Sequence, residues 1–401
     1  MNALYKPNEL HVGIDVGSLS HSIAIGDTHG NFIKEFEITH NQKGFDEFFK
    51  TIENEANKAD AVIAIAMEGY NGWARPLDKL ILQKRYKLYN VNNVKLARFK
   101  EIFPAAAKSD SIDARKIVEL FSLQKHLPAA KEVLQEIPTP DESNTKLKKL
   151  TRRRRQLVDE RIAIANRFSA DLQAEAPDLK ALSPSVTNLW FLRFIILKKD
   201  IRQLSRVHKK SIMKIDHLGP KRLEPILQWQ KEARFSDSLD YTASILYEDA
   251  MRLLELKDKI KELGKQIDEL IPSSQIARVI KTIPGFSTIS AGTLAGEIGT
   301  IDRFRSESSL ALYLGMTNLD NSSGKRKGSK RNMATNKSAK TAMVTAVMKH
   351  SQHVEESKAY IEKKISQGKN YQQAIRSLGR HMVRVIWNMI QQDRAYEIRE
   401  K

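Results

Sequence analysis

The stretch His-Val-Gly-Ile-Asp-Val-Gly, residues 11–17, decides the fold of the first part of the chain. It is a short apolar run that carries one acid, Asp15. A second run, Ala-Val-Ile-Ala-Ile-Ala-Met-Glu-Gly at 61–69, is apolar until it closes on Glu68. Continuous apolar runs of this length are typical of strands buried on both faces of a sheet. We therefore expect Asp15 and Glu68 to lie side by side in one sheet.

Strand-like and helix-like patterns alternate around these two runs. We expect strands at 11–16, 22–26 and 32–39, a helix at 43–56, a central strand at 61–67, a helix at 73–84 and a strand at 86–91. The second and third strands form a hairpin across the turn at 27–30. Three antiparallel strands followed by helix, parallel strand, helix and strand resemble the order of the ribonuclease-H-like fold. The sequence thus predicts an α/β domain over 1–140.

The composition changes from about residue 141, where a basic helical region is predicted over 141–272. Seven basic side chains and no acid lie within 146–155: Lys146, Lys148, Lys149, Arg152, Arg153, Arg154 and Arg155. A second long helix is expected over 241–270, because its apolar residues alternate steps of three and four, the spacing of a coiled-coil seam. These are Leu253, Leu256, Ile260, Leu263, Ile267 and Leu270. The two long helices are expected to pack antiparallel, either as a solvated spacer or as a dimerisation arm that also grips phosphates.

A third, helical region is predicted over 273–401. It opens with a Pro-Gly turn and an Ala/Gly-rich helix at 283–299, which either hold a phosphate as a helix-hairpin-helix does or serve close helix packing. Helices are expected at 307–314 and 338–350. Between them, Ser322-Ser323-Gly324 precedes another basic run without acids: Lys325, Arg326, Lys327, Lys330, Arg331, Lys337 and Lys340. Taken alone, Asn-Ser-Ser-Gly is ordinary turn sequence.

The charge of the chain predicts a polyanionic partner. Lys and Arg number 67 against 48 Asp and Glu, a formal net charge of +19 over 401 residues, which favours nucleic acid and salt-sensitive binding. No apolar stretch is long enough for a membrane span and the N-terminus has no signal-peptide pattern, so a soluble, cytoplasmic protein without membrane contact is expected. The absence of cysteine excludes disulfides and thiolate zinc sites.

Four acids form the candidate metal site. Asp110 and Asp113 are spaced i and i+3, so they share one helix face and can approach the same point as Asp15 and Glu68. Mg²⁺ prefers oxygen ligands, and two such ions about 3.5–4 Å apart can activate the attacking oxygen and stabilise the leaving one in phosphoryl transfer. The alternative is coincidence, with Asp110 serving only as a helix N-cap.

With these residues in place, the sequence resembles the insertion-sequence transposases that have an Asp-Glu-Asp-Asp site, relatives of the Piv-type DNA invertases. Asp15, Glu68, Asp110 and Asp113 match the four acids, and Lys108-Ser109 leads the last pair as is common there. The segments 297–304 and 310–315 are similar to the approach to the family's serine, which 322–324 then match. Ser323, directly before Gly324, is favoured over Ser322. The sequence departs from the usual family pattern at 333–336.

The resemblance implies a RuvC-like N-terminal domain, a long coiled-coil middle and a helical C-terminal transposase domain. It implies that the four acids bind Mg²⁺, or Mn²⁺, while Ser323 or Ser322 attacks a DNA phosphate and forms a covalent phosphoserine link. Target and donor DNA would be the substrates, a bridge RNA would act as guide, and the protein would be a homo-oligomer, either dimer or tetramer. The basic runs at 146–155 and 325–331 would bind nucleic acid.

Other classes stay open at this stage. One is a Mg²⁺-dependent nuclease or Holliday-junction resolvase in which water is the nucleophile, and another is a site-specific DNA invertase. A third is a non-catalytic nucleic-acid-binding protein. Sugar-kinase and actin-like ATPases also begin with Gly-Ile-Asp-Val-Gly, but the basic helical middle does not suit a second lobe of that kind.

Overall fold

The computed structural model describes residues 8–69, 75–91, 110–126, 133–138, 141–236, 239–321, 328–330, 332–333 and 335–398; the side chains of 75, 110–112, 125–126, 320 and 329 lie outside this description. The chain divides into two compact units, 1–139 and 140–401. Each unit has hydrophobic cores of its own.

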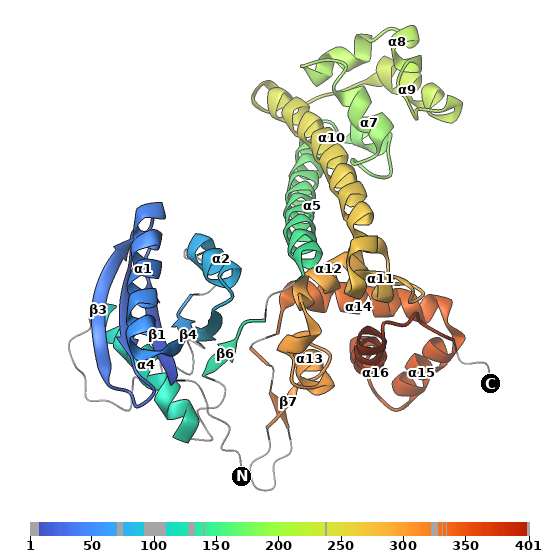
Figure 1. Cartoon of the computed structure of the whole chain (residues 1–401). Coiled ribbons are helices and arrows are strands. Elements are labelled where there is room, and N and C mark those ends of the chain that lie inside the picture. Colours follow the sequence, from blue (N-terminus) through green and yellow to red (C-terminus); the bar gives the residue numbers. More distant parts are fainter. Residues whose placement is uncertain are drawn as a thin grey trace. The chain divides into compact units, whose positions relative to one another are not determined.

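A six-stranded sheet with the order β3-β2-β1-β4-β5-β6 forms the centre of the first unit (Figure 1). Its strands are β1 (Asn8–Val16), β2 (Ser20–Gly26), β3 (Phe32–Thr39), β4 (Ala61–Met67), β5 (Lys87–Val91) and β6 (Leu134–Glu136). β1 pairs antiparallel with β2 and parallel with β4, and β4 pairs parallel with β5. This mixed sheet is compatible with the expected RuvC-like fold.

Helices cover both faces of the sheet. On one face, α1 (Gln42–Ala59) and α2 (Arg75–Gln83) bury apolar side chains against β1 and β4, in a core that includes Ile14, Phe48 and Ile65. On the other face lies α4 (Asp110–His126), which packs against β1 and β2. Because both faces are covered, the central strand β4 is apolar along its whole length.

The predicted elements of this unit are confirmed, with small shifts at their ends. The hairpin turn also matches, since Gly30 N–H donates to the carbonyl of Asp27 (3.2 Å). The sequence did not predict β6, a strand of three residues that pairs antiparallel with β5. So short a strand has no periodicity of its own to reveal it.

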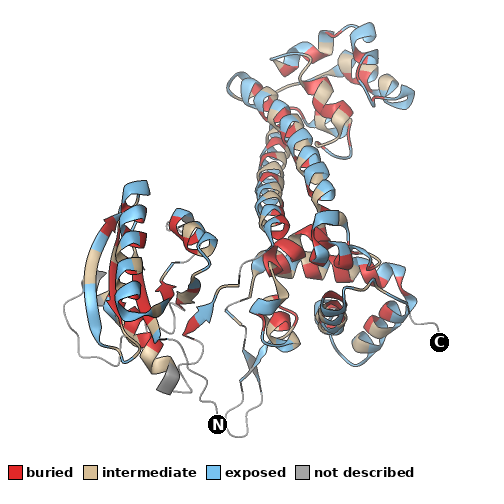
Figure 2. Ribbon diagram, viewed as in Figure 1, coloured by how far each residue is buried: buried red, intermediate tan, exposed pale blue. Residues whose placement is uncertain are grey.

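Two long helices dominate the first part of the second unit: α5 (Glu142–Glu175) and α10 (Leu239–Leu270). They pack against each other and run antiparallel, because Arg167 pairs with Asp249 while Arg252, further along α10, pairs with Glu160 (Nε to carboxylate, 2.9 Å in each case). Buried residues of both helices, such as Phe168 and Leu253, belong to one core, and buried positions recur along both ribbons in Figure 2. The connection between them consists of short helices: α6 (Pro177–Ala181), α7 (Leu189–Ile195), η2 (Ile201–Arg206), α8 (Lys209–Met213) and α9 (Pro220–Glu232).

The remainder of the second unit is helical. It contains η3 (Ile271–Ser273), α11 (Gln275–Lys281), α12 (Thr288–Ile298), η4 (Ile301–Arg303), α13 (Glu307–Tyr313), α14 (Lys337–His353), α15 (Glu355–Ser366) and α16 (Tyr371–Gln392). A two-stranded ribbon, β7 (Leu319–Asp320) and β8 (Ser329–Lys330), lies between α13 and α14. The base of α5 and the end of α10 share the core of these helices, through Leu147 and Ile267.

The glycines of 283–299 serve close packing. A Cβ on Gly296 would lie 2.5 Å from the backbone nitrogen of Lys148, so only glycine lets α12 approach α5. Gly285 has a positive φ of 84°, and a Cβ there would lie 2.3 Å from the backbone nitrogen of His350. The Pro-Gly turn thus packs tightly against α14. Of the two interpretations of this segment, phosphate binding and close helix packing, these contacts support helix packing.

Candidate active site

Asp15 and Glu68 are neighbours in the sheet. The parallel pairing of β1 with β4 sets Ile14 opposite Met67, and the backbone N–H of Glu68 donates to the carbonyl of Ile14 (3.2 Å). Asp15 is the next residue of β1, and Glu68 is the first residue after β4. Residues at the same register on adjacent strands point to the same face of a sheet, so both carboxylates belong to one face. Both residues are half-buried.

That face is the one covered by α4. Side chains alternate along a strand, so Asp15 shares its face with Gly13 and His11. The ring of His11 stacks on Phe121 of α4, with centroids 4.3 Å apart. A Cβ on Gly13 would lie 2.4 Å from the backbone oxygen of Ala114, also in α4. Glycine at position 13 therefore lets the start of α4 lie directly against the strand that carries Asp15.

Asp113 occupies the first turn of α4, one residue before Ala114. Its carboxylate is half-buried, and the Nζ of Lys116 lies 3.8 Å from its Oδ1. α4 begins at Asp110, whose side chain lies outside the described residues. The fold thus brings Asp15, Glu68 and the first turn of α4 to one face of the sheet. Among the side chains that the structure describes, no three acids or histidines are close enough to hold a metal ion together.

The chemistry of these donors fits a hard divalent cation. Carboxylate oxygens are the ligands that Mg²⁺ and Mn²⁺ favour, and Mg²⁺ usually keeps several waters and takes few protein ligands. Asp15 lies on a rigid central strand and Glu68 directly follows one, so the sheet fixes their spacing. Asp15, Glu68 and Asp113 are therefore the described candidates for ligands of such an ion, with Asp110 as the fourth candidate.

In the second unit, Glu297 is the centre of a buried polar network. Its side chain has no exposed surface, and it accepts two hydrogen bonds from Arg152 (Nε to Oε1, 2.7 Å; Nη2 to Oε2, 2.9 Å). Asn336 Nδ2 donates to Glu297 Oε2 (2.9 Å) and also lies 2.8 Å from the hydroxyl of Tyr313. The hydrogen bonds with Glu297 raise the pKa of Arg152, whereas burial lowers that of nearby Lys148. Four helices, α5, α12, α13 and α14, meet at this carboxylate.

The backbone around Glu297 is held as well. Tyr313 Oη donates to the carbonyl of Glu297 (2.9 Å), and Arg303 Nη1 donates to the same oxygen (3.0 Å). The guanidinium of Arg303 lies 4.7 Å from the centre of the Tyr313 ring. Burial raises the pKa of the Tyr313 hydroxyl, so this group stays a neutral donor at physiological pH.

This network closes the base of the segment that carries the candidate serines. The chain leaves α13 after Tyr313 and returns to α14 at Asn336, whose N–H donates to the Tyr313 carbonyl (2.9 Å) and whose side chain caps α14. Between these points β7 pairs with β8, and Asn321 N–H donates to the carbonyl of Gly328 (2.9 Å). Ser322 and Ser323 lie outside the described residues, as do Lys325, Arg326, Lys327 and Arg331, while Lys330 is exposed on β8.

Comparison with known proteins places this architecture in a family. A family model of transposases of the IS110 type with an Asp-Glu-Asp-Asp site matches residues 12–177, and a model described as the transposase IS116/IS110/IS902 family matches residues 277–362. The first match includes all four candidate acids and the second includes both candidate serines. The chain belongs to this family of insertion-element transposases.

Two relatives of this transposase match over nearly its full length, and a third matches over part of it. The 44.8 kDa protein of insertion element IS116 from Streptomyces clavuligerus is 21% identical, covering 98% of this chain and 97% of its own length. The 43.6 kDa protein of insertion element IS110 from Streptomyces coelicolor is 22% identical, covering 97% and 95%. The 42 kDa protein of IS900 from Mycobacterium paratuberculosis is 26% identical over 38% of this chain and 39% of its own.

Family membership confirms that the chain is a DNA transposase, an enzyme that acts on DNA. Transposases with an Asp-Glu-Asp-Asp site generally depend on a divalent metal. Along the part of the chain that the structure describes, no helix combines the length and apolar character that crossing a membrane requires.

Within the basic run at 146–155, some cations form ion pairs with acids of the protein and others do not. Arg152 bonds to Glu297, Arg155 to Asp159 (2.6 Å) and Lys146 to Glu142 (2.9 Å). Lys149 and Arg154 form no ion pair with a described residue. In the sequence the seven cations look alike, because their partners lie on other turns and other helices. Arg152 in particular helps to fold the second unit.

Proposed function

We infer that this transposase cuts and rejoins target and donor DNA with Mg²⁺ or Mn²⁺ held by Asp15, Glu68, Asp110 and Asp113. The observation that carries the inference is the adjacency of Asp15 and Glu68 on the sheet face against which the first turn of α4, with Asp113, is packed. The site is of the RuvC-like kind that the resemblance implies. When bound, a divalent cation polarises phosphate oxygens and favours loss of a proton from a nearby hydroxyl.

The nucleophile in this proposal is the hydroxyl of Ser323, with Ser322 as the alternative. The serine oxygen forms a bond to phosphorus as the bond from phosphorus to one deoxyribose oxygen breaks, and that oxygen leaves as a hydroxyl after taking up a proton. The resulting phosphoserine link conserves the bond energy. Rejoining is the reverse: a DNA hydroxyl attacks the phosphorus and the serine hydroxyl is released. Neighbouring cations such as Lys325 and Lys330 would offset negative charge on the phosphate.

Support for a nucleophile in this segment comes from the network around Glu297, which joins the two ends of the segment. The contacts of Asn336 with Tyr313 and Glu297 close the base of the segment 314–336. A nucleophile must be placed within a fraction of an ångström of its target, so anchoring at the base of its loop favours catalysis.

Serine variants test this chemistry. Ser322→Ala with Ser323→Ala is expected to abolish strand transfer, while each single variant identifies which hydroxyl reacts. If the double variant still cuts DNA, water is the nucleophile, and the protein works as a nuclease or resolvase. DNA binding without metal serves as the control, because it does not require the hydroxyls.

Guidance by a bridge RNA is the second part of the proposal. The net charge of +19 supports binding of a structured RNA together with DNA. Sequence choice would then reside in base pairing with the guide and not in side chains. Purified protein is expected to carry a discrete RNA. Ribonuclease treatment, followed by removal of the ribonuclease, should abolish recombination until that RNA is added back. Full recombination by RNA-free protein would refute guidance.

A dimer or tetramer completes the proposal, with α5 and α10 as a coiled-coil arm. Large apolar side chains stand exposed on α10, where Tyr241 is 84% and Ile245 42% exposed. These two residues are spaced i and i+4, so they share a helix face. Light scattering on Tyr241→Glu with Ile245→Glu is expected to show a smaller assembly than the wild type, whereas an unchanged mass would exclude this contact.

A further inference from the structure

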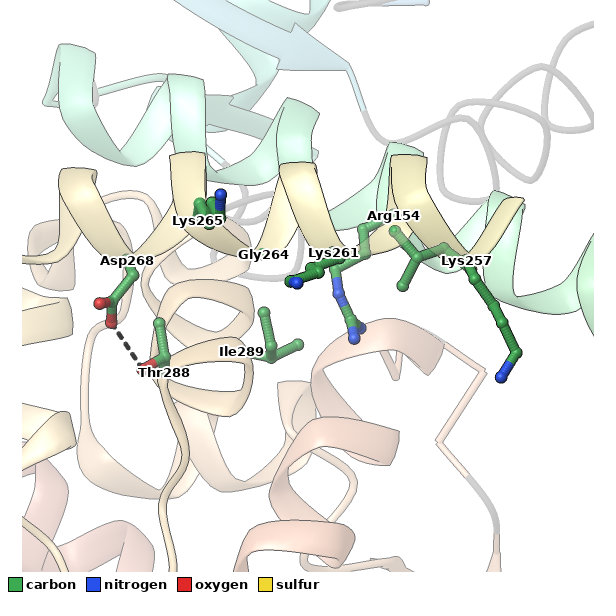
Figure 3. Close-up of a pocket in the computed structure, with 9 residues that line it drawn as sticks. Arg154, Lys257, Lys261, Gly264, Lys265, Asp268, Thr288 and Ile289 are labelled. Carbon is green, nitrogen blue, oxygen red and sulfur yellow. Dashed lines mark hydrogen bonds between the residues drawn. The ribbon is translucent and has the colours of Figure 1, made fainter. Parts of the chain in front are cut away.

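A groove between α5, α10 and the start of α12 has four cations among its nine lining residues. Its volume is about 440 Å³, and its lining includes Arg154, Lys257, Lys261 and Lys265 (Figure 3) together with the apolar residues Ile260 and Ile289. The three lysines are spaced i, i+4 and i+8 and therefore form one stripe along α10. Arg161, two turns beyond Arg154 on α5, adds to the positive potential felt by Arg154 and Lys257.

These cations have no acidic partners among the described residues. Elsewhere on the same two helices six cations pair with acids: Lys146, Arg152, Arg155, Arg167, Arg252 and Lys259. In the groove, by contrast, the Nε of Arg154 is buried and no described atom accepts its hydrogen bond. Burial and the proximity of Arg161 lower the pKa of both Arg154 and Lys257. The positive charges of the groove therefore lie close together and are partly desolvated, and no acidic side chain among the described residues pairs with them.

One acid, Asp268, lies at the end of the groove, and it is already engaged. Its Oδ1 accepts a hydrogen bond from the hydroxyl of Thr288 (2.8 Å, dashed in Figure 3) and lies 3.5 Å from the Nζ of Lys281. The hydrogen bond from Thr288 and the charge of Lys281 lower the pKa of Asp268. Asp268 therefore fixes the start of α12 at the groove and does not neutralise the lysine stripe.

Gly264 is a second, independent observation. It lies in the interior of the 32-residue helix α10, where glycine is destabilising relative to alanine. A Cβ at this position would meet nothing within 4 Å, so packing does not require glycine there. Glycine also serves where a backbone must be approached closely by a ligand. Gly264 lies in the groove lining between Lys261 and Lys265, where it leaves room beside the helix backbone.

We propose that this groove binds the sugar-phosphate backbone of a nucleic acid. Lys257 to Lys265 span eight residues of helix, a rise of about 12 Å. Phosphates of one strand of a duplex follow one another every ~3.4 Å along its axis, so the stripe is long enough for three to four of them. Arg154, with its planar array of donors, suits a phosphate at one end. The inference requires a nucleic-acid partner but neither the serine nor the metal chemistry.

Binding measured without metal tests the groove directly. The groove variant is Lys257→Gln, Lys261→Gln and Lys265→Gln in the full-length protein. Its charge-matched control is Lys58→Gln, Lys259→Gln and Lys358→Gln, three exposed lysines that each pair with a glutamate on their own helix. The affinity of each protein for labelled duplex DNA and for a labelled hairpin RNA is measured against salt concentration in EDTA, and thermal unfolding confirms that both are folded.

On duplex DNA, log affinity falls as log salt concentration rises, and each phosphate contact contributes ~0.9 to the steepness of this line. The line of the groove variant is expected to be less steep than that of the wild type by about 2 to 3. Loss on the DNA alone or on the RNA alone identifies which nucleic acid occupies the groove. A slope equal to that of the control on both probes overturns the proposal. A normal slope combined with inactive serine variants would refute the groove while leaving the proposed function intact.

Gly264→Met tests the same site without changing charge. A Cβ at this position meets no other atom, and the rest of a methionine side chain is expected to enter the groove that Gly264 lines. It is expected to weaken binding severalfold at unchanged or raised thermal stability, since methionine favours helix more than glycine does. Affinity equal to that of the wild type for both probes would show that no ligand approaches this backbone.

Discussion

The backbone oxygen of Ala114 lies 2.4 Å from the position that a Cβ on Gly13 would occupy. This contact determines how closely α4 lies against β1, and with it how Asp113 is held relative to Asp15. The conflict would be with backbone, which cannot rotate away as a flexible side chain can. The glycine of Gly-Ile-Asp is thus a structural requirement of the candidate metal site.

Gly13→Ala is the first prediction. The added methyl group forces α4 outward, and overpacking of this kind costs about 1–3 kcal/mol. We expect the first unit to unfold at a lower denaturant concentration. We also expect a loss of strand transfer larger than the loss of stability explains. Ala66→Gly, on the neighbouring strand, is a suitable comparison because it creates space without displacing α4. Wild-type stability and activity in Gly13→Ala would show that the contact is not required.

The carboxylates give the second prediction. Asp15→Asn, Glu68→Gln and Asp113→Asn should each reduce Mg²⁺-dependent DNA cleavage on the order of a hundredfold or more, since bound metal supplies several kcal/mol of transition-state stabilisation. DNA binding in EDTA should be retained. Asp46→Asn, an exposed acid on α1 at the opposite face of the sheet, is the control. Cleavage at the control's rate in Asp15→Asn and Asp113→Asn would place the metal elsewhere.

The Arg152–Glu297 pair gives the third. Arg152→Ala leaves the fully buried carboxylate of Glu297 without its main partner, and because the arginine is half exposed we expect a cost of about 2–4 kcal/mol. Arg152→Met combined with Glu297→Gln should cost less than the sum of the two single variants. A double-mutant cycle on the free energy of unfolding measures this coupling. Strictly additive costs would mean that the two side chains act independently.

A pH dependence follows from His21. Burial, followed by the charge of nearby His40, lowers the pKa of His21 to about 4, and its Nε2 lies 2.8 Å from His40 Nδ1. Since the unfolded chain has the ordinary value of about 6.5, it binds the proton first. Stability from the neutral ring is complete above pH 6.5 and is lost as the pH falls toward 4, by about 2 kcal/mol between pH 7 and pH 5.

His21→Asn should remove this part of the acid sensitivity. The unfolding free energy of the wild type minus that of the variant is expected to decrease between pH 7 and pH 5, whatever other groups titrate. A difference that does not change over this interval would mean that His21 is protonated equally in the folded and unfolded chain.

The sequence predicted most of the first unit because its signals are local. Two apolar runs, each with an acid, sufficed to predict the strands β1 and β4, which pair in the sheet. It could not predict the contact of Gly13 with Ala114, or the partners of Glu297, which are 145 and 39 residues away in the chain. A run of seven basic residues also looks uniform until folding brings acids to some of them. Pairing between distant residues is a property of the fold, and composition and spacing carry no trace of it.

Trapping the covalent intermediate tests the central claim most directly. A nicked suicide DNA that releases its leaving strand is incubated with the protein, its guide RNA and Mg²⁺, and the attached peptide is mapped by mass spectrometry. We predict a DNA-linked phosphoserine at Ser323 or Ser322, absent in Asp15→Asn and absent in EDTA. Efficient cleavage without any protein-DNA adduct, or an adduct on another residue, would contradict the account.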